Sequence, residues 1–365
     1  MRPKAYPPKQ SGDPANRGFV VSLPIDLCAI YLKNLFMKVA ILNFEGAVAS
    51  SVAGPYDMFS KVKMISETLR VKTKMFFEVD VISSQYMNAE LPFNMVGNLS
   101  VSTRRQYDLV LVPAMQGDRV DSTLLREIEM IKWIKKQYQG GAEVACICMG
   151  AFILASTGLL DGKRATTHWM GSAYFRKLFP QVILEDNKVI IDEGRIYSCG
   201  AAFSFTSLII YLIEKFCGKD MALAASKVFM IQVHDSSQQA FSIFNLQRNH
   251  EDVEISRVQS YIEKNYEEAL TIAQLASRFN MSARTFIRKF AAVTGNTPLE
   301  YIQRVRVEAA KRLLEKGKLT VEQVCMESGY ADFGFFRNIF KRLTGLAPQE
   351  YKRKYGSMFN EAVVG

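Results

Sequence analysis

The residues best placed to do chemistry in this 365-residue chain are a cysteine and a histidine twenty positions apart. Cys148 lies in the run EVACICMGAFILASTGLL, which predicts a buried strand, a sharp turn and a helix that packs through small residues. Such a turn presents its side chain above a sheet, and the backbone amides that follow can stabilise an anion. His168 follows in ATTHW. The pattern predicts one shared polar site, used either for nucleophilic catalysis or for ligand binding.

Backbone donors are expected to complete this site. The amides of Met149 and of a loop containing Ala114 and Met115 are predicted to meet a polar or anionic group. His168 would donate or accept a hydrogen bond from the opposite wall. The predicted ligand-binding set is therefore Cys148, His168, Met149, Ala114 and Met115.

The elements that must position these residues alternate between strand and helix from residue 37 to about residue 218. Apolar runs predict strands at residues 39–43, 76–82, 109–112, 144–147 and 189–191. Amphipathic stretches predict helices at residues 56–69, 124–138, 151–157 and 203–216. Buried strands separated by helices favour an α/β fold with a doubly wound, mostly parallel sheet, in which ligands gather at the carboxyl ends of strands.

A second functional region lies near the C-terminus, where one unit occurs twice. Thr271 and Thr320 are related by an offset of 49 residues, whereas Phe286 and Phe336 are related by 50, so the second copy has one extra residue in its turn. Thr271 with Gln274, and Thr320 with its own Gln three residues later, fit the reciprocal N-cap box that begins a helix. Each copy is predicted to fold as helix, tight turn, helix.

In a helix-turn-helix, the second helix enters the major groove of DNA. The outward residues predicted to contact DNA are Arg284, Ile287, Arg288 and Lys289 in the first copy, and Phe333, Gly334, Arg337, Asn338 and Lys341 in the second. Among them Arg288 and Arg337 are expected to read bases, while the later run Lys352, Arg353 and Lys354 approaches phosphate.

The segment between the copies, TPLEYIQRVRVEAAKRLLEKG, opens with a third cap box and predicts one continuous helix. Its expected length of about 28 Å is close to the roughly 34 Å of one DNA turn, so both reading helices fit successive major grooves on one duplex face. Residues 279–355 hold 15 Lys or Arg against 7 Asp or Glu, which accounts for most of the net charge of +10. This basic surplus is typical of phosphate binding.

Residues 255–355 resemble the AraC/XylS family of DNA-binding domains, through the frames LA...NMS...F...F and GY.D..FFR.IFKR..G..P.EY. Residues 37–218 resemble the PfpI/ThiJ-like branch of the class I glutamine amidotransferase-like superfamily, through the cysteine turn and ATTHW. Together they resemble the GlxA family of bacterial transcriptional regulators. The resemblance implies a flavodoxin-like first domain, in which Cys148 matches the reactive cysteine and His168 its histidine partner.

The chain departs from these relatives at three places. Ser51 stands where enzymes of the branch carry a glutamate, and the run Pro113, Ala114, Met115 replaces their PGG loop. Gly334 stands where the DNA-binding family usually has Ser. The missing glutamate favours a transcription regulator that senses a small metabolite, with no catalytic residues and no enzymatic activity. The alternative is a cysteine-dependent hydrolase or glyoxalase-like enzyme that carries a DNA-binding domain.

Composition sets the remaining expectations. The chain has no run of 18 apolar residues, and its six cysteines form neither a CxxC pair nor a zinc-like spacing, so we expect a cytoplasmic protein without metal, cofactor or membrane span. The expected partners are a double-stranded DNA operator, a small-molecule effector, a second copy of the chain in a homodimer, and RNA polymerase. The predicted domains are residues 1–36, a disordered extension or misassigned start; residues 37–247, the sensor; and residues 248–365, the DNA-binding domain.

Overall fold

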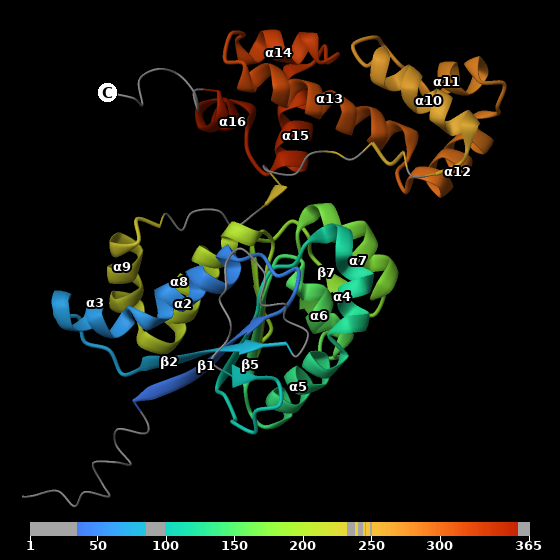
Figure 1. The fold of residues 1–365 in the computed structure, drawn as a ribbon. Coiled ribbons are helices and arrows are strands. Elements are labelled where there is room, and N and C mark those ends of the chain that lie inside the picture. Colours follow the sequence, from blue (N-terminus) through green and yellow to red (C-terminus); the bar gives the residue numbers. More distant parts are fainter. Residues whose placement is uncertain are drawn as a thin grey trace, which may run out of the picture.

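The computed structural model describes residues 35–84, 99–231, 238–239, 244, 246–248 and 250–356. Figure 1 shows an α/β domain followed by a helical domain. The strands of the first domain are β1 (Phe36–Asn43), β2 (Phe76–Ser83), β3 (Leu99–Ser100), β4 (Leu109–Val112), β5 (Glu143–Ile147), β6 (Arg164–Ala165), β7 (Ile183–Leu184), β8 (Ile190–Asp192) and β9 (Ile196–Cys199). Its α-helices are α2 (Ser50–Ser60), α3 (Val62–Leu69), α4 (Val120–Arg126), α5 (Ile128–Gln139), α6 (Gly150–Ser156), α7 (Ser172–Leu178), α8 (Phe205–Cys217) and α9 (Lys219–Val228).

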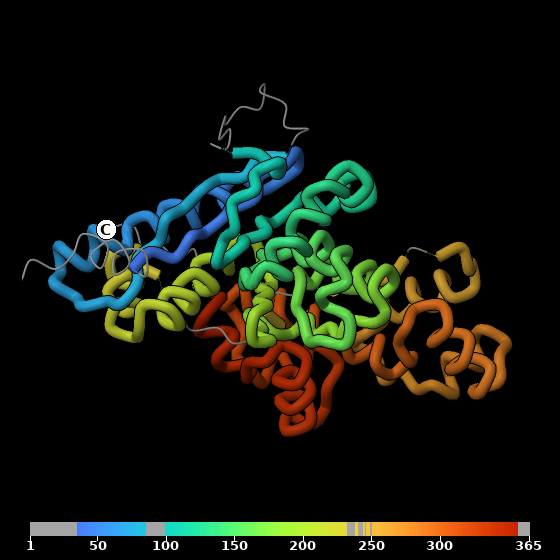
Figure 2. The backbone as a smooth tube through the Cα atoms, turned by 90° about the horizontal axis from the view of Figure 1, so that it is seen from below, coloured from blue at the N-terminus to red at the C-terminus, as the bar shows by residue number. Residues whose placement is uncertain are grey.

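The main sheet has the order β3-β2-β1-β4-β5-β9-β8 and is parallel except for the antiparallel pair β8 and β9. Helices α2, α3, α8 and α9 cover one face and α4 to α7 cover the other, as both views show (Figures 1 and 2). Apolar side chains from both faces of the strands are fully buried, which explains their continuous apolar runs. The predicted doubly wound, mostly parallel α/β fold is confirmed.

Two differences from the predicted elements concern the site. Strand β9 was not predicted, although it pairs with β5 beside Cys148. Its four residues are too few for the apolar pattern of a strand to be recognised in the sequence. The single helix predicted over residues 56–69 is two helices, α2 and α3, and α2 begins at Ser50 although Gly54 and Pro55 suggest a break. The hydroxyl of Ser51 donates to Val48 O at 2.6 Å and anchors the first turn.

The N-terminal boundary also differs. The predicted extension of residues 1–36 falls outside the described residues up to residue 34. Leu35 and Phe36, however, belong to the sheet, because Leu35 O accepts a hydrogen bond from Phe76 N and Phe36 is aligned with Phe76 in β2. The prediction placed these two residues in the extension because their apolar pattern merges with the run before them in the sequence.

The second domain consists of α10 (Val253–Lys264), α11 (Ile272–Arg278), α12 (Ala283–Thr294), α13 (Pro298–Glu315), α14 (Val321–Glu327), α15 (Phe333–Thr344) and α16 (Pro348–Tyr355). Helices α11 and α12 form the first helix-turn-helix unit, and α14 and α15 the second. Each unit has its own core of paired phenylalanines, and α13 contributes its first half to one core and its second half to the other. The predicted duplication and the single connecting helix are confirmed.

The helix starts in this domain follow the predicted cap chemistry. Capping boxes form at Thr271, Thr297 and Thr320. Asn280 and Gly329 adopt the left-handed backbone expected in the two turns, with φ of 55° and 82°. Among the described helices, none is both long and apolar enough to cross a membrane.

Candidate nucleic-acid interface and ligand site

The reading helices α12 and α15 each bury one face and leave the other outward. Phe286 and Phe290 pack inside the first unit, and Phe336 and Phe340 inside the second. All but one of the residues predicted to contact DNA are exposed. The exposed ones are Arg284, Ile287, Arg288, Phe333, Gly334, Arg337, Asn338 and Lys341. The two outward faces differ in chemistry, because Ile287 and Arg288 of the first unit occupy the helix positions of Arg337 and Asn338 in the second.

The exception is Lys289, which was predicted to face DNA. Its Nζ lies 2.5 Å from Glu254 Oε2 and 3.3 Å from Asp252 Oδ2, both at the start of α10. The side chain is therefore turned toward the first helix of its own domain and held there by two carboxylates. Helix periodicity placed Lys289 near the outward face, but it carries no information about the packing of α10.

One outward residue was missed by the sequence analysis. Phe335 is 50% exposed in the first turn of α15, beside Phe333 at 41%. An exposed aromatic pair at the start of a reading helix can contact thymine methyl groups in the major groove. The signal is present in the run DFGFF, but the sequence analysis assigned only Phe333 and Gly334 of this run to the outward face.

A half-buried arginine, Arg306, contacts segments of both units. Arg306 of α13 donates from Nε to Tyr266 O at 2.8 Å and from Nη2 to Glu268 O at 2.7 Å, both between α10 and α11. Its guanidinium also lies 5.1 Å from the ring centre of Tyr330, in the turn of the second unit. In that turn a Cβ at Gly329 would lie 2.6 Å from Tyr266 O, so only glycine permits this close approach.

Replacing Arg306 with Met should therefore loosen the spacing between the units. We expect a loss of about 1 to 3 kcal/mol in the free energy of unfolding, because two carbonyls lose charged donors. Denaturant unfolding of the full chain measures this, with the exposed Arg312→Met of the same helix as control. Equal unfolding midpoints for the two variants would contradict the role given to Arg306.

In the first domain, Cys148 occupies the sharp turn between β5 and α6. Its φ of 55° is in the left-handed region, which non-glycine residues seldom adopt outside functional turns. The backbone is fixed from β9, since Cys148 N donates to Cys199 O at 2.7 Å. The predicted elbow is therefore present in its backbone geometry.

The thiol of Cys148 is poorly suited to act as a nucleophile. The side chain is only 6% exposed, and burial raises the pKa of the thiol to about 11, although the amides of Met149 and Ala202 favour the thiolate. A cysteine with this pKa is a neutral thiol at physiological pH, whereas catalytic cysteines act as thiolates. The Met149 amide thus lies where the sequence analysis expected an anion-stabilising donor.

Ser51 occupies the position that carries a glutamate in related enzymes, and its hydroxyl already takes part in hydrogen bonds within the domain. Ser51 is fully buried, and its Oγ accepts a hydrogen bond from Ala114 N at 2.9 Å. The Ala114 amide, expected to face a ligand, is therefore already paired. Met115 is buried in the core behind the loop. The nearby Glu45 forms an ion pair with Arg126 at 2.5 Å and does not replace the missing carboxylate.

His168 is half-buried next to this site. Its Nδ1 accepts from Met170 N at 3.2 Å, and burial lowers the pKa of the ring, which favours a neutral imidazole. The preceding residue, Thr167, donates from Oγ1 to Cys148 O at 3.0 Å. The structure thus places the His168 segment against the Cys148 turn through the Thr167 bond. In the part of the chain that is described, no hydrogen bond joins the side chains of Cys148 and His168.

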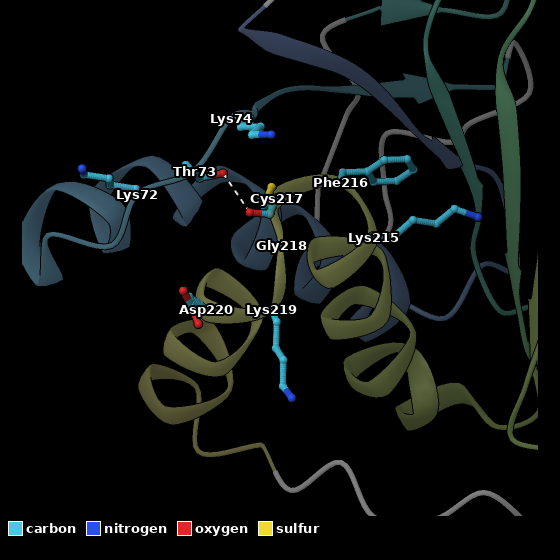
Figure 3. Close-up of a pocket in the computed structure, with 9 residues that line it drawn as sticks. All are labelled: Lys72, Thr73, Lys74, Lys215, Phe216, Cys217, Gly218, Lys219 and Asp220. Carbon is cyan, nitrogen blue, oxygen red and sulfur yellow. Dashed lines mark hydrogen bonds between the residues drawn. The ribbon is translucent and has the colours of Figure 1, made fainter.

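A cavity lies away from Cys148, at the other end of the sheet. Its volume is about 660 Å³, and it lies where the segment before the N-terminal end of β2 meets the junction of α8 and α9, whereas Cys148 follows the C-terminal end of β5. Figure 3 shows that its lysines point in different directions. One of them, Lys215, is already bound to Asp192 at 3.0 Å. This cavity lacks converging polar groups, and among the described residues no cluster of three side chains fits a metal ion.

Comparison with known proteins identifies both domains. Residues 37–212 match the DJ-1/PfpI family, and residues 275–354 match a helix-turn-helix domain family. The chain is a DJ-1/PfpI domain joined to an AraC-type helix-turn-helix domain. This is the combination that the sequence analysis expected.

Curated relatives that match the chain over about 60% of its length are named as transcriptional regulators. The HTH-type transcriptional regulator CdhR of Pseudomonas aeruginosa is 28% identical over 229 residues, which are 60% of this chain and 66% of CdhR. The HTH-type transcriptional regulator GlxA of Rhizobium meliloti is 26% identical over 220 residues, 60% of this chain and 67% of GlxA. The match to CdhR thus spans just under two thirds of that relative. Drosophila melanogaster DJ-1beta aligns with 54% of this chain and 100% of its own, at 15% identity and a TM-score of 0.42.

Proposed function

We propose that this protein is a sequence-specific DNA-binding transcription regulator whose DJ-1/PfpI domain binds a small effector without converting it. The observation that carries the DNA-binding half is the pair of exposed reading helices, α12 and α15, on one rigid connecting helix. The 18 residues of α13 correspond to a length of about 27 Å, close to one turn of DNA. The names of CdhR and GlxA as HTH-type transcriptional regulators support this reading.

The non-catalytic role of the first domain is supported by its site. Catalysis by Cys148 would need a thiolate and a base or acid tuned to the working pH. The thiol is instead buried with a raised pKa, and the hydroxyl of Ser51 is committed to the Ala114 amide. Ligand binding needs only polar groups in a fixed arrangement. Cys148, Met149 and His168 remain the proposed contacts, while Ala114 and Met115 would shape the wall.

The alternative, a cysteine-dependent hydrolase or glyoxalase-like enzyme, is favoured by one observation, the left-handed elbow at Cys148. The reactivity of the thiol separates the two functions. We expect alkylation of Cys148 by iodoacetamide to rise about tenfold per pH unit and to level off only near pH 11, because the neutral thiol predominates below its pKa of about 11.

Peptide mass spectrometry assigns the alkylated residue, with the buried Cys217 as an internal control. A rate that levels off below pH 8 at Cys148 alone would show an activated thiolate. That result would favour the cysteine-dependent enzyme over the non-catalytic regulator.

The remaining partners follow from this function. A small-molecule effector, a homodimer, and a contact with RNA polymerase stay predictions. A protein that reads DNA works where the chromosome lies, so we place it in the cytoplasm.

A further inference from the structure

One side chain after α9 is docked into the DJ-1/PfpI domain in an unusual way. Gln238 is only 4% exposed, and its Nε2 donates to Thr167 O at 2.9 Å and to Thr166 Oγ1 and Lys188 O, both at 3.2 Å. Its backbone N donates to Asn187 O at 2.9 Å. Buried glutamines are uncommon, and they are retained where hydrogen bonds compensate for the loss of water.

The slot that holds this carboxamide depends on a glycine. A Cβ at Gly200 would lie 2.5 to 2.6 Å from the Nε2, Cδ and Oε1 of Gln238, so any other residue would fill the space. Gly200 follows β9 directly, at the carboxyl end of the strand beside β5. The slot is thus an acceptor-lined cleft of one carboxamide's size, which we call the carboxamide slot: Thr166, Thr167, Lys188 and Gly200.

The docking is incomplete, because Oε1 of Gln238 is buried and has no hydrogen-bond partner among the described residues. An unpaired buried carbonyl opposes docking and offsets part of what the amide nitrogen gains. The contact is therefore one that a modest change in the slot can break.

The carboxamide slot shares its structure with the proposed ligand site. Thr167 accepts from Gln238 with its carbonyl and donates to Cys148 O with its hydroxyl. Cys199, next to Gly200, accepts from Cys148 N. A ligand that moves the Cys148 turn or the segment before His168 must also move a wall of the slot.

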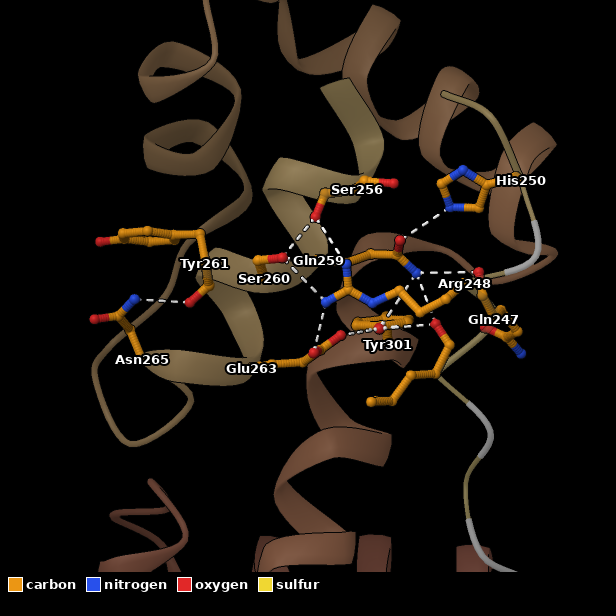
Figure 4. Close-up of polar contacts among 11 residues, drawn as sticks. Gln247, Arg248, His250, Ser256, Gln259, Ser260, Tyr261, Glu263, Asn265 and Tyr301 are labelled. Carbon is orange, nitrogen blue, oxygen red and sulfur yellow. Dashed lines mark hydrogen bonds and ion pairs between the residues drawn. The ribbon is translucent and has the colours of Figure 1, made fainter. Parts of the chain in front are cut away.

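The chain that follows Gln238 is attached to the helix-turn-helix domain at Leu246 and Arg248. Leu246 O accepts from Gln259 Nε2 at 2.8 Å and from Tyr301 OH at 3.1 Å, which ties it to both α10 and α13. Two residues later, Arg248 donates to Glu263 at 2.6 Å and to Ser260 at 3.1 Å (Figure 4). Leu246 comes eight positions after Gln238, which limits the distance between their Cα atoms to about 28 Å.

We propose that the carboxamide slot is an intramolecular docking site for Gln238, and that occupancy of the Cys148 and His168 site changes how long Gln238 stays docked. Docked, Gln238 holds the helix-turn-helix domain on a short tether. When Gln238 is released, the tether becomes longer, and the reading helices can reach DNA from a larger range of positions. The effect on DNA binding rests on the proposed function, whereas the docking itself does not.

The docking is tested without DNA, on the full chain. Gln238→Glu keeps the size but places a carboxylate against three acceptor oxygens, Gly200→Ala fills the slot, and Gln238→Ala only removes the bonds. The exposed Gln181→Ala is the matched control in the same domain. We expect limited chymotrypsin cleavage between residues 231 and 250 to accelerate roughly two- to tenfold in all three variants, because about one net hydrogen bond is lost.

Small-angle scattering should show a larger radius of gyration for the same three variants than for the unmutated chain. Gln181→Ala should show no increase. Thermal melting checks that each variant is folded; if Gly200→Ala fails, the two Gln238 variants decide. Cleavage and scattering equal to those of the unmutated chain would overturn the docking.

The coupling to the ligand site has its own test. Thr167→Val removes the donor to Cys148 O but keeps the carbonyl that holds Gln238. Faster cleavage in Thr167→Val than in Gln181→Ala supports coupling, and an unchanged rate refutes it. If the unmutated chain passes these docking tests but binds no DNA duplex, the proposed function is wrong and the docking of Gln238 still stands.

Discussion

Replacing Arg288 with Ala should weaken binding to the preferred duplex by about 1 to 3 kcal/mol and remove the base preference at one position. Arg288 is exposed on α12, and no hydrogen bond or ion pair holds it within the described part of the chain. Arg337 of α15 should behave in the same way at the other half of the site. The duplex is first selected from a random pool by the unmutated protein, and affinities are then measured by fluorescence anisotropy.

Arg353→Ala provides the control for charge alone. This residue is exposed on α16, where it is predicted to approach phosphate, so its loss should weaken all sequences alike and reduce the salt slope by about one. If Arg288→Ala selected the same sequences with the same affinity as the unmutated protein, α12 would not be a reading helix.

The neighbouring residues Phe286 and Ile287 should give opposite results. Phe286 is fully buried in the core of the first unit, so Phe286→Ala should cost about 3 to 5 kcal/mol in the free energy of unfolding. Ile287 is 41% exposed, so Ile287→Ala should change that free energy by less than about 0.5 kcal/mol. Its effect should appear in DNA binding, through lost contact with thymine methyl groups.

Denaturant unfolding followed by circular dichroism measures both variants. The helix-turn-helix domain should unfold early in Phe286→Ala while the DJ-1/PfpI domain keeps its own transition, because the two domains have separate cores. Similar destabilisation by both substitutions would mean that the assignment of inward and outward faces of α12 is wrong.

The helical domain was predictable from the sequence because its signals are local. Each cap box spans four residues, the left-handed turns fall on Asn280 and Gly329, and the paired phenylalanines recur at helical spacing. The elbow at Cys148 was predictable for the same reason, since strand, turn and small-residue helix are adjacent in the chain.

Contacts between distant segments could not be predicted in this way. Lys289 pairs with Glu254, 35 residues earlier, and Ala114 with Ser51, 63 residues earlier. Gln238 lies in a polar stretch typical of a linker, and only the folded domain places its carboxamide against Gly200. Sequence periodicity assigns residues to faces, but the packing of other elements decides which polar groups remain free.

The central claim is that α12 and α15 read two successive major grooves of one duplex at a spacing fixed by α13. The most direct measurement compares the affinity of the full chain for its selected duplex with that for the same duplex carrying about five extra base pairs between the half-sites, which is half a helical turn. We expect the affinity for the lengthened duplex to fall to that of a duplex with one half-site, because the rigid α13 cannot follow the rotation. Equal affinity for the two duplexes would contradict it.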